Sequence, residues 1–90
     1  MKNNKQKNII ETIIDIGDNQ LLLDAFLKDL LTPLEYLEIK KRWEIIKMIN
    51  VGMSQHQIAK KLHVGIATVT RGSKALKKSR GGFIQVLKNI

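Results

Sequence analysis

The feature that most constrains the fold is helical spacing of apolar residues, cut at short intervals by helix-breaking residues. Isoleucines and leucines recur three or four positions apart, and no alternation of apolar and polar residues lasts long enough for a strand. Breaks are expected at Gly17, Thr32-Pro33, Gly52 and Gly81-Gly82. The sequence therefore predicts an all-α fold of six helices, at about residues 9–16, 19–30, 33–50, 54–61, 65–77 and 83–87.

Local start and stop signals support these boundaries. Thr32 is suited to cap the third helix, with Pro33 at its first position and Glu35 completing a capping box. Ser54 and Gln57 have the spacing of a second capping box. Gly52 is placed to end the third helix in a left-handed conformation.

The length of 90 residues fits a single small domain. A chain of this size buries only roughly 60–65% of its unfolded surface, so a monomer gains little stability from its own core. Apolar stripes on at least four helices then favour a homodimer. We expect a flexible arm over residues 1–8 and one helical DNA-binding and dimerisation domain over residues 9–88.

The charge is distributed unevenly along the chain. Residues 1–50 contain all eight carboxylate side chains and eight basic residues, whereas residues 51–90 contain eight basic residues and no carboxylate. The formal net charge of +8 therefore belongs to the last forty residues. A solvated surface usually mixes both signs, so this distribution favours binding of a polyanion by the second part of the chain.

Residues 54–77 have the spacing of a helix-turn-helix, in which the second helix enters the DNA major groove. Ile58, Leu62, Val64 and Val69 are expected to form its small core. His63 occupies the turn, a position that needs a left-handed backbone and is usually glycine. The predicted DNA-contacting residues are Gln55, His56, Lys60, Lys61, Gly65, Ile66, Ala67, Thr68, Thr70, Arg71, Ser73 and Lys74.

Other classes of site have little support. The chain has no cysteine, which excludes disulfides, thiolate metal sites and cysteine catalysis and makes a reducing cytoplasm suitable. His56 and His63 have no further ligands near them, so no metal site is expected. No catalytic constellation is recognisable, and neither an enzyme activity nor a cofactor is predicted. No apolar run reaches the roughly 18 residues of a membrane span.

The chain resembles the tryptophan repressor family at Thr32-Pro33, at Met53-Ser54-Gln55 and above all over Gly65–Ser73. The resemblance covers about residues 9–88. It implies a six-helix, intertwined homodimer that represses transcription by binding operator DNA, with L-tryptophan as a regulatory corepressor. The target genes would serve tryptophan biosynthesis or transport.

The resemblance also implies a ligand site. Arg42 and Arg71 would flank the indole, and Arg71 would also bind the ligand carboxylate. Gly72 would leave room for the ring. The residues assigned to the ligand in this way are Asp29, Leu31, Thr32, Arg42, Arg71, Gly72 and Ala75.

Two of these positions depart from the family pattern. Ala75 stands where the family has a serine that binds the ligand's amino group, and Asp29 stands where the family has an apolar residue. Asp29 either replaces the missing hydroxyl or points to water. Two alternatives therefore remain open: a regulator of the same fold that does not respond to tryptophan, and the DNA-reading module of a transposase.

Overall fold

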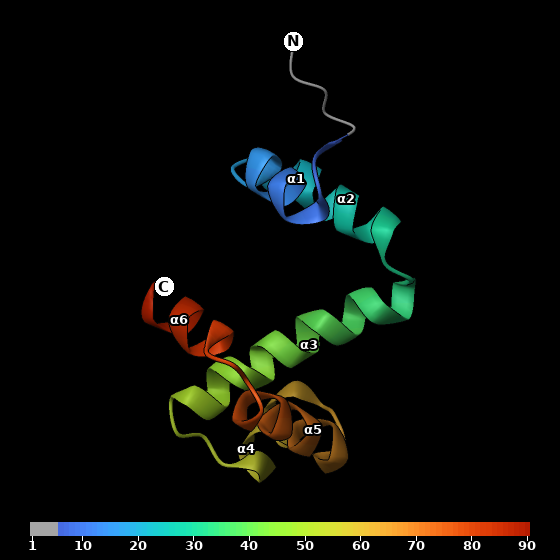
Figure 1. Cartoon of the computed structure of the whole chain (residues 1–90). Coiled ribbons are helices and arrows are strands. Elements are labelled where there is room, and N and C mark those ends of the chain that lie inside the picture. The colour runs from blue at the N-terminus through green and yellow to red at the C-terminus, as the bar shows by residue number, and fades with distance from the viewer. Residues whose placement is uncertain (1–5) are drawn as a thin grey trace. The chain divides into compact units, whose positions relative to one another are not determined.

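The computed structural model describes residues 6–90, and within that range it contains six α-helices and no strand (Figure 1). This confirms the predicted all-α, six-helix architecture. The helices are α1 (Ile9–Ile16), α2 (Gln20–Leu30), α3 (Pro33–Asn50), α4 (Gln55–Leu62), α5 (Ile66–Lys77) and α6 (Gly82–Lys88). None of these described helices is long and apolar enough to cross a membrane.

Both predicted capping boxes are present. The Thr32 hydroxyl accepts from the Glu35 amide at 3.1 Å, and the Glu35 carboxylate accepts from the Thr32 amide at 2.9 Å. Ser54 and Gln57 make the same reciprocal pair at 3.2 and 3.0 Å. Each box satisfies two backbone donors at a helix start, which would otherwise need water. The hydrogen bond from the Thr32 amide also holds the pKa of Glu35 below its usual value.

Two of the described helices, α3 and α4, end at residues with a left-handed backbone. Gly52 after α3 has a φ of 92°, as its position in the sequence predicts. His63 caps the C-terminus of α4 at φ 57° and ψ 45°. A non-glycine residue in this conformation carries strain, because its Cβ crowds the following carbonyl oxygen.

The chain divides into two compact units, which are described separately. In the first, which extends to Tyr36, the Asp24 carboxylate accepts from the Tyr36 hydroxyl and pairs with Lys28 at 2.9 Å. The hydrogen bond between Lys28 and the Asp24 carboxylate raises the pKa of Lys28 above its usual value. Neither α1 nor α2 contains a buried residue. The single domain expected over residues 9–88 stays a prediction.

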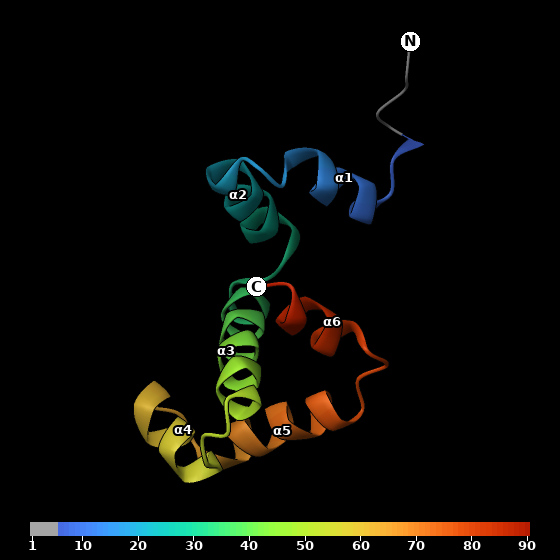
Figure 2. The same cartoon turned by 90° about the vertical axis from the view of Figure 1, so that its left-hand side faces the viewer.

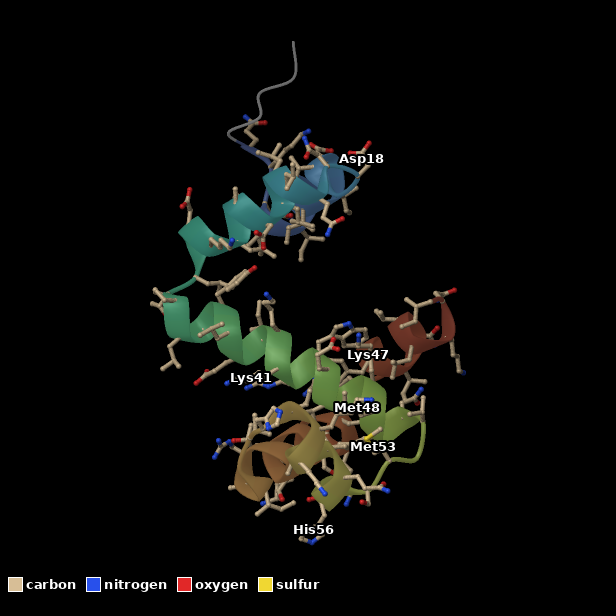
Figure 3. The ribbon with its side chains drawn as sticks, turned by 180° about the vertical axis from the view of Figure 1, so that it is seen from behind. Asp18, Lys41, Lys47, Met48, Met53 and His56 are labelled. Atoms are coloured by element: carbon tan, nitrogen blue, oxygen red, sulfur yellow. The ribbon has the colours of Figure 1, made fainter. Side chains whose placement is uncertain are left out.

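The second unit, Leu37–Ile90, holds a small core where α3, α4 and α5 meet. Ile45, Ile58 and Val69 each supply a buried side chain, one from each of these helices. Figure 2 shows α4 and α5 lying at the C-terminal end of α3. Met48 and Met53 pack beside them, between the end of α3 and the helix pair (Figure 3). The core therefore holds the α4–α5 pair against α3.

Gly72 is the point of closest approach between α3 and α5. A Cβ atom built on Gly72 would lie 2.6 Å from the Cγ2 methyl of Ile45, closer than two carbon atoms can pack. Only a residue without a side chain fits there while Ile45 keeps its position. On the other side of α3, Trp43 stacks on Phe83 of α6 with ring centroids 6.5 Å apart.

Candidate functional site

The helices α4 and α5, joined at His63, cover the segment that is predicted to be a helix-turn-helix, and many of its predicted DNA-contacting residues are accessible. His56, Lys60 and Lys61 on α4 are exposed, and His56 lies at the tip of the unit in Figure 3. Along α5 and its cap, the exposed members of the predicted DNA-contacting set are Gly65, Ile66, Ala67, Arg71 and Lys74. Gln55, Thr68 and Thr70 are half-buried.

Ser73 is the one member of that set that lies in the interior, with 9% of its surface exposed. Val69 and Gly72 are also buried, and residues at this spacing share the face of α5 that packs inward. Ser73 therefore does not belong to the exposed surface of this chain.

A hydrogen bond across the helix pair fixes the start of α4 against α5. The Thr70 hydroxyl lies 2.9 Å from the Gln55 side-chain oxygen and 3.0 Å from the Ile66 carbonyl oxygen. This contact joins the half-buried Gln55 side chain to α5.

The N-terminus of α5 is open to an anion. Gly65 is its N-cap, and no side chain hydrogen-bonds to the first backbone amides of the helix. Such amides, together with the helix dipole, favour a phosphate group. Residues 51–90 contain no acidic side chain, so no carboxylate of this segment competes for those amides.

A pocket of about 170 Å³ lies between α3 and α5. It brings together Arg42, Arg71 and Gly72, three of the residues that the family resemblance assigns to a ligand. The complete lining is Glu38, Lys41, Arg42, Ile45, Thr68, Arg71 and Gly72. The pocket therefore presents two guanidinium groups from different helices, which can bind a carboxylate or stack on a flat ring.

The Arg71 side chain is held at one wall of this pocket. Its Nη2 atom donates to the Thr68 hydroxyl oxygen at 3.3 Å, one helical turn earlier on α5. Lys41 lines the pocket from α3, on the side that faces the helix pair (Figure 3). Because Arg71 is also exposed on α5, it belongs both to the pocket and to the accessible face of the helix.

The other predicted ligand residues are not among the pocket's lining. Ala75 follows Arg71 by one turn on α5 and is half-buried. Asp29, Leu31 and Thr32 belong to the first unit, and their part in a ligand site stays a prediction.

Sequence reasoning missed three lining residues on α3, namely Glu38, Lys41 and Ile45. Their spacing from Arg42 carries a signal. Positions 38, 41, 42 and 45 fall on one face of a helix, so a pocket that includes Arg42 is expected to include its neighbours on that face.

Within residues 6–90, no group of three or more histidine, aspartate or glutamate side chains is arranged to hold a metal ion.

Comparison with known proteins gives a consistent result. The model of a family described as Trp repressor protein matches residues 5–90. The Trp operon repressor homolog of Vibrio campbellii is 42% identical over 72 residues, which cover 79% of this chain and 71% of that protein. No solved structure matches the chain.

Two further relatives carry the same description. The Trp operon repressor homolog of Vibrio parahaemolyticus is 39% identical over 70 residues, 77% of this chain and 64% of that protein. The homolog of Photobacterium profundum is 46% identical over 55 residues, 60% of this chain and 53% of that protein. The matches therefore leave a substantial part of each relative uncovered.

Proposed function

This chain belongs to the Trp repressor protein family, and we propose that it is a sequence-specific DNA-binding repressor with L-tryptophan as its corepressor. Its targets would be genes of tryptophan biosynthesis or transport, and it would act in the cytoplasm. The family consists of transcription regulators and not of enzymes. The family model that matches residues 5–90 is that of the Trp repressor protein, and this match gives no support to the transposase alternative.

The observation that carries the proposal is the double position of Arg71. This residue lines the pocket between α3 and α5 and is exposed on α5, the second helix of the helix-turn-helix. A ligand that stacks between Arg42 and Arg71 would restrict the Arg71 side chain, which donates to the Thr68 hydroxyl on the same helix. Binding of such a ligand would thereby change the affinity of α5 for DNA.

The exposed cations of the helix-turn-helix support DNA as the partner. Four exposed cations can contact phosphates, namely Lys60, Lys61, Arg71 and Lys74. Thr68, near the start of α5, is the residue that we expect to contact a base. The log of the affinity should fall with the log of salt concentration by about 0.9 per neutralised phosphate. Lys74→Ala should weaken binding to all duplexes alike, whereas Thr68→Ala should reduce discrimination between sequences.

The decisive experiment starts from a pool of random DNA duplexes. Sequences are selected on the purified protein with and without L-tryptophan, and the affinity of the best duplex is then measured in both conditions. L-tryptophan should tighten binding, and the duplex should tighten L-tryptophan binding by the same factor, because the coupling is reciprocal. Equal DNA affinity in both conditions would remove the corepressor and leave a helix-turn-helix regulator that does not respond to tryptophan.

We also propose that the working form is an intertwined homodimer. Large apolar side chains are exposed in the single chain, including Ile14 at 72% and Leu21 at 85%. A shallow apolar groove lined by Trp43, Phe83 and Val86 adds to this surface. Monomeric proteins rarely leave so much apolar surface in water. Sedimentation equilibrium should give twice the mass of the chain, and a folded monomer at micromolar concentration would count against the dimer.

A further inference from the structure

The pocket between α3 and α5 contains one negative charge among its positive ones. Glu38 lines it together with Lys41, Arg42 and Arg71. We propose that Glu38 accepts the ammonium group of the ligand, so that the pocket selects a zwitterionic amino acid over a plain carboxylate. This inference rests on the proposed function and names the residue that determines its ligand specificity.

The first argument is the charge of the lining. Three cations would suffice to hold a carboxylate, and a nearby carboxylate side chain weakens the attraction of such a pocket for an anion. A ligand that carries both signs turns Glu38 from a repulsive group into an attractive one. A zwitterion is therefore the ligand that uses every charge of the lining.

The second argument is that Glu38 is available. The ion pairs found among the described residues join Lys7 to Asp15, Lys28 to Asp24 and Lys47 to Glu44, and none of them includes Glu38. The Glu38 side chain is exposed at the pocket, so its carboxylate can receive a partner without a buried contact first being broken.

The third argument is the spacing along α3. Glu38 precedes Arg42 by four residues, which places the two side chains on one face and about 6 Å apart along the helix axis. Both side chains are long and flexible. The ammonium and carboxylate groups of an α-amino acid are attached to one carbon atom, and two side chains at this spacing can converge on them.

The fourth argument is that the facing helix offers no competing acceptor of equal strength. Ala75, one turn after Arg71, has only a methyl group. The Thr68 hydroxyl oxygen already accepts from Arg71. Glu38 is the only carboxylate among the residues that line the pocket.

The test is isothermal titration of the full chain with two ligands. L-tryptophan has both charged groups, and indole-3-propionate has the same ring and a carboxylate but no ammonium. Glu38→Gln keeps the shape of the side chain and removes its charge. The variant should bind L-tryptophan about 10- to 100-fold more weakly, the range expected for loss of a charge-assisted hydrogen bond. It should bind indole-3-propionate equally well or more tightly.

One control variant and one competing variant show whether a loss of L-tryptophan affinity is specific to the charge of Glu38. Glu44→Gln makes the same charge change on the same helix at a residue that pairs with Lys47 at 2.6 Å and does not line the pocket. It should leave both affinities unchanged. Asp29→Asn is no control, because the resemblance assigns Asp29 to the ligand site; it tests the competing carboxylate for the ammonium group.

The outcomes distinguish the two proposals. If the natural chain binds L-tryptophan and Glu38→Gln binds it equally well, Glu38 is not the ammonium acceptor, while the proposed corepressor stands. A loss confined to Asp29→Asn would overturn the assignment to Glu38 in the same way. If the natural chain binds indole-3-propionate as tightly as L-tryptophan, the pocket does not select for the ammonium group and the Glu38 proposal is wrong. If it binds neither, the corepressor and the Glu38 assignment both fall.

Discussion

Replacing Gly72 by alanine should reveal how tightly α3 and α5 are packed. The new Cβ atom would lie 2.6 Å from Ile45 Cγ2, 3.3 Å from Ile45 Cβ and 3.8 Å from Ile45 Cδ1. Only the first of these contacts is impossible without movement. Ile45 is 1% exposed and is part of the core, so its side chain is held by the residues packed around it.

Two effects of opposite sign decide the stability of this variant. Alanine in place of glycine inside a helix stabilises by about 1 kcal/mol. Overpacking of a filled core destabilises by roughly 1–3 kcal/mol. Since the clash involves a fully buried methyl group, we expect the second effect to be larger and Gly72→Ala to lower the free energy of unfolding by up to about 2 kcal/mol.

A second substitution identifies the methyl group responsible. Ile45→Leu removes the branch at Cβ and therefore the Cγ2 atom, whereas Ile45→Val keeps this atom and removes Cδ1. In the leucine background, Gly72→Ala should become neutral or stabilising, and in the valine background it should remain destabilising. The coupling free energy between Gly72→Ala and Ile45→Leu should be roughly 1–3 kcal/mol.

The measurement is urea unfolding at one fixed protein concentration, because the stability of a dimer depends on concentration. The single and double variants form a double-mutant cycle. The reasoning is refuted if Gly72→Ala stabilises the natural chain, or if the valine background relieves the effect as well as the leucine background does.

Two further predictions concern the helix ends. His63→Gly should raise the free energy of unfolding by a few tenths to about 1 kcal/mol, because relief of left-handed strain outweighs the greater freedom of glycine in the unfolded chain; a loss of stability in the same urea assay would contradict this. Glu35 has a lowered pKa in the folded chain, so its stabilisation is complete above its unfolded pKa of about 4.3 and is lost as the pH falls through the folded pKa. Glu35→Gln should therefore flatten the decline of stability below about pH 4.3, and an unchanged acid profile would show that the capping box makes no such contribution.

Much of the local structure follows from residues a few positions apart. Both predicted capping boxes form because each partner lies three residues from the other. The left-handed positions at Gly52 and His63 follow for the same reason, since the conformation of a helix end depends on its own turn. The uneven distribution of charge along the chain follows directly from the order of the residues in the sequence.

What only the tertiary structure decided is which helices pack against each other and at which residues they approach. The approach of Gly72 to Ile45 joins residues 27 positions apart, and no local pattern specifies it. The same packing buries Ser73, which the motif alone placed among the DNA contacts. It also brings Glu38 to the pocket beside Arg71, because the faces that α3 and α5 turn toward each other are set by the shared core of Ile45, Ile58 and Val69.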